Sequence, residues 1–554
     1  MATTLPPAPS APTHEVTNQP PPLAPLNLFT SNRPLVEALE REGAGWARGR
    51  LEEAGAAWGG APLVEWGPQA NEHPPVLRTH DRYGHRIDEV EFHPAWHELM
   101  ALASAHELHS LPWTAGRAGA HAARTALYLA AGAAEAGHGC PTTMTFAAVP
   151  ALRTQPELAA EWEPLLTAPR YDGRLIPAAE KGSAKCGMAM TEKQGGSDVR
   201  ANTTAAVPVS GSGGPGEEYL LRGHKWFCSA PMCDLFLVLA RTDEGIGCFA
   251  VPRVLPDGGR NPFRLQRLKD KLGNRSNASS EVELDGTWGR LVGEPGRGVR
   301  TIIEMVGHTR LDCVIGSAAG MRWAVANAIH HAAHRAAFGR KLVDQPLMRN
   351  VLADLAVESE AATVLAMRLA RAYDEEDTAL RRLGTAVAKY WVCKRYPGVA
   401  FEAMECLGGN GYVEESGMPR LFRESPLNSI WEGSGNVNAL DVLRALAREP
   451  RLLGAFRAEL ALAAGADRRL DAAVCALEAE LADPEELEVR ARRVVERMAL
   501  CWQGALLVQG APPAVADAFC AGRLDPGAAG AALGTLPRGL DLGAIIERAA
   551  PAPA

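Results

Sequence analysis

Features that would place the chain in several specialised classes of protein are missing from its sequence. It has 11 cysteines but no CxxC pair and no Cys/His set at zinc spacing, so we expect no metal site. No secretory signal pattern is present, and an odd number of scattered cysteines favours reduced thiols in the cytoplasm. The longest apolar region, residues 299–337, contains charged residues such as Glu304 and Arg310, so we predict no membrane span.

A global excess of positive charge is missing too. The net charge is −8, which gives no general attraction to nucleic acid or to membrane surfaces. Residues 441–550 contain no lysine, and 13 arginines stand against 16 acidic residues there. Three of those arginines, Arg492, Arg493 and Arg497, could still form a local basic face on a helix. An amphipathic helix with solvated arginines explains them equally well.

With 554 residues and 47% hydrophobic content, the chain is long enough for several domains. Changes in composition divide it into five parts, and we expect a mainly α protein with a central β domain. The expected parts are a disordered arm (1–26), an N-terminal helical domain (27–182), a β domain (183–295), a helical bundle (296–446) and a C-terminal helical extension (447–550).

Two patterns support this division. Residues 299–337 can form one helix about 50–60 Å long at the standard rise per residue. Polar and apolar residues alternate through 280–284, as a half-buried strand requires. Helices are also expected over 34–48, 94–109 and 117–136, and strands over 219–227, 235–240 and 248–254.

A short stretch, residues 428–436, contains one carboxylate, Glu432, between Trp431 and Gly433. Its glycines and small polar residues allow a ligand to approach the backbone closely. A carboxylate in an apolar site has a raised pKa and can act as a general base. Taken alone, a helix-capping turn with a solvated Glu432 is the simpler interpretation.

Four more motifs occur along the chain, and each is ambiguous by itself. Residues 190–198 form a Gly-Gly-Ser loop, whose open N–H groups could hold phosphates or a ring carbonyl. Residues 223–229 place adjacent aromatic residues on a strand, where His224 and Lys225 are expected at the surface. Residues 335–345 join an arginine at a helix end to Phe-Gly, and residues 405–412 break a helix at Gly408 and Gly409.

In this order and spacing, the motifs resemble those of the acyl-CoA dehydrogenase flavoproteins over about residues 102–446. The resemblance implies a helical domain, a barrel-like β domain and a four-helix bundle, with FAD as cofactor. It implies that Glu432 is the catalytic base, taking the α-proton of an acyl-CoA while the flavin accepts the β-hydride. The base position used in another branch is Thr309 here, so that alternative is not expected.

The resemblance assigns further residues to binding. Those expected at the flavin of the same subunit are Met190, Thr191, Gly195, Gly196, Ser197, Phe227, Ser229, Trp431, Gly433, Ser434 and Asn436. Those expected to reach the FAD of a neighbouring subunit are Arg335, Phe338, Gln345, Gly408 and Gly409, which implies a homotetramer. Ser197, Arg310 and Gly433 are expected at the substrate.

Residues 190–199, 268–279 and 428–436 bring the match closer to one branch, the bacterial flavoproteins of the adaptive response to DNA alkylation. In that branch the C-terminal domain is implicated in binding duplex DNA. Two functions therefore stay open. One is an acyl-CoA dehydrogenase, an oxidoreductase of CH–CH groups. The alternative is a DNA-binding protective flavoprotein with residual, isovaleryl-CoA-like dehydrogenase activity.

Overall fold

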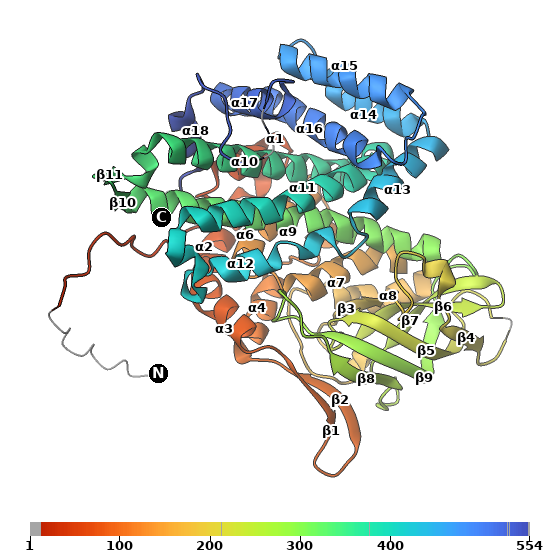
Figure 1. Ribbon diagram of the computed structural model, residues 1–554. Helices are drawn as coiled ribbons and strands as arrows, with labels where there is room; N and C mark the ends of the chain where they lie inside the picture. Colours follow the sequence, from red (N-terminus) through yellow and green to blue (C-terminus); the bar gives the residue numbers. More distant parts are fainter. Residues whose placement is uncertain (1–12, 212, 376, 529, 531, 552–554) are drawn as a thin grey trace.

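The computed structural model describes residues 13–211, 213–375, 377–528, 530 and 532–551. A helical layer, a β domain and a long helical bundle lie side by side, and further helices cover the bundle on the opposite side from the β domain (Figure 1). This arrangement confirms the expected fold class. The boundaries drawn at residues 26, 182, 295 and 446 stay a prediction.

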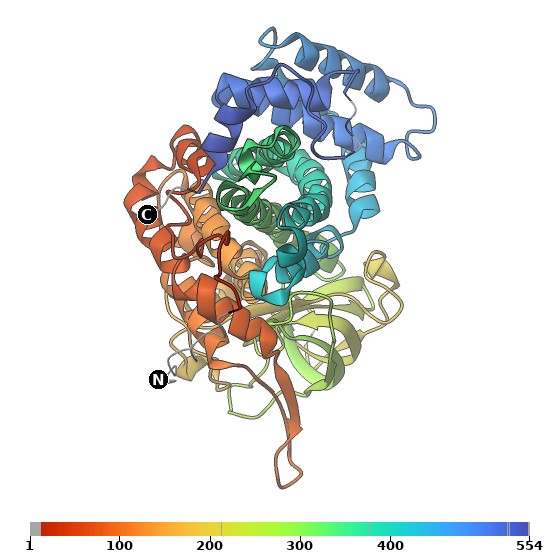
Figure 2. The same cartoon turned by 60° about the vertical axis from the view of Figure 1, so that its left-hand side comes forward.

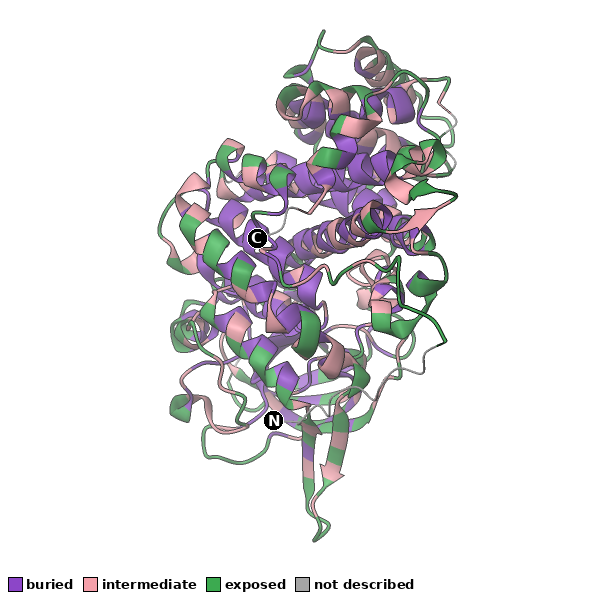
Figure 3. Ribbon diagram, turned by 90° about the vertical axis from the view of Figure 1, so that its left-hand side faces the viewer, coloured by how far each residue is buried: buried purple, intermediate pink, exposed green. Residues whose placement is uncertain are grey.

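The chain before the sheet is helical, apart from one projecting hairpin (Figure 3). Its helices are α1 Arg33–Arg41, α2 Arg48–Trp58, α3 Gly67–Glu72, α4 Pro94–Ala105, α5 Leu111–Thr114, α6 Ala120–Ala134, α7 Gly139–Leu152 and α8 Pro156–Leu166. The hairpin pairs β1 Val76–His80 with β2 Arg86–Glu91. The single helix expected over 34–48 is wrong, because α1 ends before Gly43, whose φ of +77° suits glycine and breaks the helix.

The N-terminal arm differs in part from the expectation. Residues 1–12 lie outside the described residues. Asn18 exchanges hydrogen bonds with the backbone of Ala336, at 2.9 Å to its O and 2.7 Å from its N, and His330 contacts the carbonyl oxygen of Pro21 at 2.7 Å. Leu26 is buried. The prediction of a disordered arm is therefore wrong for residues 18–26, which find polar and apolar partners on the bundle.

The β domain is a sheet that closes on itself. Its strands are β3 Cys186–Ala189, β4 Ala205–Pro208, β5 Glu218–Ser229, β6 Leu235–Thr242, β7 Gly245–Pro252, β8 Phe263–Leu268 and β9 Ser279–Leu291. The strands pair in the order β6, β4, β5, β9, β7 and back to β6, while β3 adds to β6 and β8 to β9. The expected alternation is present, since Ser280, Val282 and Leu284 are buried and Glu283 is exposed.

The bundle is built around α9 Gly298–His334, which at 37 residues is about 55 Å long and confirms the predicted long helix. It packs against α6, α7, α10 Pro346–Asp374 and α11 Thr378–Cys406, and Figure 2 shows these long helices nearly end-on. The bundle continues through α12 Met418–Glu424 and α13 Gly435–Arg448. A small hairpin, β10 Ala336–Ala337 with β11 Arg340–Lys341, lies at one end.

The C-terminal helices are α14 Arg451–Ala461, α15 Arg468–Ala482, α16 Ala491–Gly510, α17 Pro513–Phe519 and α18 Leu542–Ala549. Their apolar faces join the core of the bundle, for example through the buried Trp502, while α7, α8 and the sheet share a second core. Among the described residues, no helix has the length and apolar character needed to cross a membrane, and no cluster of His, Cys, Asp or Glu side chains could hold a metal ion.

Candidate functional site

The loop that carries Glu432 lies between α12 and α13, where the bundle meets the β domain (Figure 1). Glu432 has φ +58° and Gly433 has φ +94°. Two consecutive residues with positive φ turn the chain sharply, and a positive φ is uncommon for glutamate. We call residues 428–436 the base loop.

The Glu432 side chain points towards α9. Its Oε2 accepts a hydrogen bond of 2.7 Å from the hydroxyl of Thr309, the residue at the alternative base position. Part of Glu432 remains reachable by solvent, yet burial of its carboxyl group raises the pKa above its usual value. The Thr309 hydrogen bond and the charges of Lys389 and Arg310 oppose that rise. This is the electrostatic setting that a general base requires.

Cationic side chains hold the base loop by its carbonyl groups. Lys389, on α11, donates to the carbonyl oxygens of Trp431 and Gly433 at 2.8 and 2.6 Å. Arg310 donates from Nε to the carbonyl of Glu432 at 2.9 Å and from Nη1 to Asp441 at 2.8 Å. Arg310, expected at the substrate, is therefore bonded to the base loop and α13.

The Gly-Gly-Ser loop of residues 190–198 closes as a tight turn. Glu192 and Gly195 exchange backbone hydrogen bonds of 3.3 and 3.0 Å, and Gly195 has φ +142°, which suits glycine. No hydrogen bond within the described part of the chain uses the N–H of Gly196 or Ser197. A Cβ on Gly196 would lie 2.3 Å from Oγ1 of Thr191. The loop thus presents open N–H groups, as the flavin implied by the resemblance requires.

Strand β5 lies next to that loop. Trp226 donates from its backbone N to the carbonyl of Thr191 at 2.9 Å. Phe227 is 54% exposed and could contact a flat ligand on the face away from Lys269, whose Nζ lies 4.7 Å from the ring centroid. The hydroxyls of Ser229 and Ser279 lie 3.4 Å apart. These residues fit a flavin ring and its polar edge.

The base loop and the Gly-Gly-Ser loop of residues 190–198, which we call the flavin loop, approach the same region. Trp431 and Met190 both pack against the core of the β domain. The thiol of Cys140, on α7, interacts with Ser229 and with Glu432, and burial raises its pKa to about 12. The structure thus brings Met190, Ser229, Trp431 and Glu432 together around α7.

A second group of expected residues lies at the far end of the bundle, beside the β10–β11 hairpin (Figure 1). Arg335 donates to the carbonyl of Asn18 at 2.7 Å, and Gln345 to that of Ala337 at 3.0 Å. Phe338 is 97% exposed. Gly408 and Gly409 begin a short 3₁₀ helix, Gly408–Tyr412, after α11. Within one chain this group does not meet Glu432.

The remaining expected residues connect the base loop to the C-terminal helices. Ser434 precedes α13, and its carbonyl accepts from the backbone N of Asn438 at 3.0 Å. Arg492, on α16, donates from Nε to Oδ1 of Asn436 at 2.7 Å. Arg493 and Arg497 both pair with Glu480, at 2.6 and 3.1 Å. The three arginines expected at DNA thus all have partners within the chain.

Sequence reasoning missed two residues and misplaced a third. Lys389 is 1% exposed and occurs within the apolar run of residues 386–392, where an isolated charge signals a buried polar contact. For Thr309, the sequence showed only that it stands at the alternative base position; its hydrogen bond to Glu432 was not foreseen. The prediction that Lys225 lies at the surface is wrong. Lys225 is 1% exposed and pairs with Glu192 at 3.0 Å, because its side chain points into the closed sheet.

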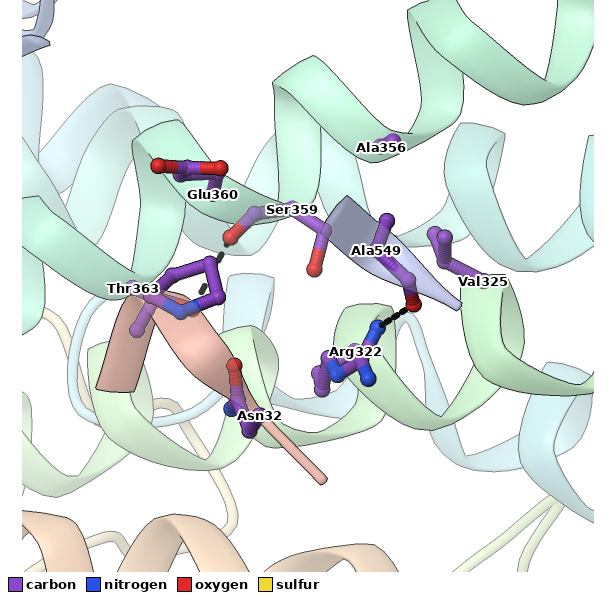
Figure 4. A pocket seen from close by; sticks show the side chains of 9 residues that line it. Asn32, Arg322, Val325, Ala356, Ser359, Glu360, Thr363 and Ala549 are labelled. Carbon is purple, nitrogen blue, oxygen red and sulfur yellow. Dashed lines mark hydrogen bonds between the residues drawn. The ribbon is translucent and has the colours of Figure 1, made fainter. Parts of the chain in front are cut away.

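A separate small cavity lies between α9, α10 and α18 (Figure 4). Its volume of about 10 Å³ is that of a single water molecule. Arg322 beside it donates to the carbonyl oxygens of Ala549 and Ser31, at 2.6 and 2.7 Å. These contacts join the two ends of the chain to the bundle, so the cavity serves packing rather than ligand binding.

Family models match three parts of the chain. They are described as the adaptive response protein AidB N-terminal domain (residues 18–173), the acyl-CoA dehydrogenase middle domain (187–287) and the acyl-CoA dehydrogenase C-terminal domain (296–447). AidB of Escherichia coli strain K12 is 47% identical over 93% of this chain and 95% of its own length. Acyl-CoA dehydrogenase family member 11 of Caenorhabditis elegans is 29% identical over 80% of this chain and 77% of its own.

Solved structures are similar as well. ACDH-11 of Caenorhabditis elegans, in complex with C11-CoA, has a TM-score of 0.81 at 26% identity and covers 94% of each chain. An acyl-CoA dehydrogenase of Bacillus anthracis complexed with FAD has a TM-score of 0.62 at 17% identity, over 77% of this chain and 80% of that one. The second likeness concerns the fold alone.

Proposed function

The chain belongs to the acyl-CoA dehydrogenase family, in the group of AidB, and from this premise we propose that it oxidises an acyl-CoA with FAD, using Glu432 as the base. The observation that carries the proposal is the ionisation setting of Glu432. Its carboxyl group has a raised pKa and a single hydrogen-bond donor, Thr309, among the described residues. FAD is the cofactor of this family, and when bound it accepts the hydride.

The residues divide the remaining work. Residues 190–197 would hold the flavin through the open N–H groups of Gly196 and Ser197, with Phe227 and Ser229 at its ring. Glu432 takes the α-proton onto its carboxylate as the Cα–Cβ double bond forms and the β-hydride leaves. The N–H of Glu432 makes no hydrogen bond to any described residue, so it is free to donate to the thioester carbonyl and stabilise charge there.

Purified protein tests this proposal directly. The released chromophore should be FAD, and anaerobic addition of acyl-CoAs should bleach the flavin absorbance. A panel of acyl-CoA thioesters that includes straight-chain acyl-CoAs and isovaleryl-CoA would identify the acyl chain that is accepted. Bound FAD that no acyl-CoA reduces would overturn the dehydrogenase assignment while leaving the family assignment intact.

We propose that the active unit is a homotetramer, in which residues at the far end of the bundle reach a neighbour's FAD. The support is three large apolar side chains that are exposed: Phe338 is 97% exposed, Tyr412 82% and Leu347 76%. An interface between subunits would bury such side chains if they lie in one patch. Light scattering should report four chains, and a monomer with full flavin content would contradict the proposal.

Duplex DNA binding through α16 is the second candidate function. Arg492 favours it, since its partner Asn436 is neutral and no ion pair joins Arg492 to another described residue. The shared pairing of Arg493 and Arg497 with Glu480 weakens the local field. Binding through phosphates should weaken steeply with salt, with a log–log slope of about −0.9 per phosphate neutralised. Absence of binding at low salt would remove this candidate.

A further inference from the structure

The base loop holds Glu432 in a conformation that glutamate seldom adopts. Its φ of +58° is followed by φ +94° at Gly433, so two successive peptide groups are turned. Such geometry persists only where surrounding groups determine it. Here those groups act on the carbonyl oxygens of Trp431, Glu432 and Gly433.

Each of these three carbonyls accepts a hydrogen bond from a side chain outside the base loop. Lys389 bonds the first and the third, at 2.8 and 2.6 Å, and so spans the residue between them. Arg310 bonds the second at 2.9 Å. Asn438, on α13, adds a bond of 2.6 Å to the carbonyl of Gly433. Lys389 is the only one of the three donors that bonds the loop on both sides of Glu432.

Lys389 is 1% exposed, and neither of its two hydrogen bonds goes to a carboxylate. A buried ammonium needs polar partners, and direct pairing with a carboxylate is the usual solution. Here the partners are backbone carbonyls, while the Glu432 carboxylate receives the hydroxyl of Thr309. The lysine charge thus acts on Glu432 without occupying its oxygens.

We propose that Lys389 is a positioning residue for the reaction: it fixes the base loop through two carbonyls and supplies a nearby positive charge, without itself bonding the Glu432 oxygens that receive the proton. The catalytic part of this inference rests on the proposed function. The positioning part concerns the loop alone and can be tested without turnover.

The groups facing Glu432 determine what a pH profile will report. They are Lys389 from α11, Arg310 and Cys313 from α9, and Cys140 from α7. Burial raises the pKa of both thiols, that of Cys140 to about 12, so they stay neutral in the acidic range. Neither thiol therefore contributes to a titration of flavin reduction below neutral pH.

The experiment compares the parent holoprotein with K389M, using the exposed Arg448, near the end of α13, for the control variant R448M. We expect K389M to reduce its flavin at least ~10-fold more slowly, because the base is no longer held in place. The pH midpoint of flavin reduction should rise by about one unit, because the variant loses the positive charge that lowers the pKa of Glu432. Amide hydrogen exchange over residues 428–436 should speed up. R448M should match the parent in all three readouts.

Unchanged loop exchange and an unchanged pH midpoint in K389M would overturn the proposal. If K389M does not fold, K389R serves instead: it keeps the charge but changes the geometry. The proposal then predicts a slower reduction with the parent's midpoint, and a normal rate would contradict it. If no acyl-CoA reduces even the parent, the proposed function fails, while loop exchange in the variant still decides whether Lys389 positions the loop.

Discussion

Two buried lysines in the described part of the chain, Lys225 and Lys389, lie near glutamates, and their hydrogen bonds differ. In the β domain, Lys225 donates directly to Oε1 of Glu192 at 3.0 Å. In the bundle, Lys389 donates to carbonyl oxygens on either side of Glu432 instead. The same two residue types therefore give a direct ion pair in one place and, in the other, a carboxylate that the lysine does not bond.

The consequences for ionisation are opposite. Burial alone would raise the pKa of Glu192, but donors on Thr203 and Thr204 and the Lys225 charge hold it below its usual range. At Glu432 burial prevails and the pKa is raised. Glu192 thus fixes the flavin loop as a permanent anion, whereas Glu432 can gain a proton. Geometry around a carboxylate, rather than residue type, separates a structural acid from a base.

Breaking the direct pair should have the largest effect. K225M leaves the Glu192 carboxylate buried without its cation, which typically costs about 3–5 kcal/mol of unfolding free energy. Chemical denaturation would measure the loss. The control variant K193M changes an exposed lysine of the neighbouring loop and should stay within about 0.5 kcal/mol of the parent. Equal stability of the two variants would mean that the pair contributes little.

The opposite pKa shifts predict opposite pH responses. Flavin reduction needs ionised Glu432, so its rate should fall about tenfold per pH unit below a midpoint that lies above the ordinary glutamate value of 4.5. Stopped-flow absorbance at graded pH measures this midpoint. A midpoint at or below 4.5 would contradict the raised pKa.

Glu192 should affect stability instead. Its folded pKa lies below the unfolded value of 4.5, so it stabilises the fold above that pH, and the contribution is lost as pH falls through the folded pKa. Acid denaturation of the parent should therefore steepen below about pH 4.5, and E192Q should lack that component. An identical acid profile in the variant would remove Glu192 from this role.

A smaller effect is expected from removing the hydroxyl of Thr309, which donates a hydrogen bond to Glu432. T309V removes the hydroxyl but keeps the shape, so the carboxylate loses about 1 kcal/mol of stabilisation and the pH midpoint of flavin reduction rises by less than one unit. T301V, on the same helix and also buried, serves as the control. A lower midpoint in T309V would indicate that the hydroxyl favours the protonated acid.

The smallest effect concerns the arginines of α16. R493A and R497A remove partly exposed partners of Glu480, so the unfolding free energy should change by about 1 kcal/mol or less. Thermal denaturation measures this change, and flavin content should be constant. A large loss of flavin would show that α16 supports the site through more than Arg492.

The sequence was informative where function depends on local pattern. Residues 431–433 located the base loop, and the long apolar region of residues 299–337 predicted the long helix α9. The alternation in β9 identified a strand. Lys389 was missed because its partners lie about 40 residues further along the chain and meet it only in the folded bundle. Lys225 was misplaced because strand alternation alone does not say which face a closed sheet encloses.

The central claim is that Glu432 is the base, and the most direct test is single-turnover flavin reduction in E432Q. This variant keeps the shape of the side chain but cannot accept the α-proton. Anaerobic stopped-flow mixing with the acyl-CoA that bleaches the parent should show unchanged FAD content and a reduction rate at least ~10² lower. E414Q, in an exposed ion pair with Arg423, should reduce at the parent rate. A parental rate in E432Q would contradict the account.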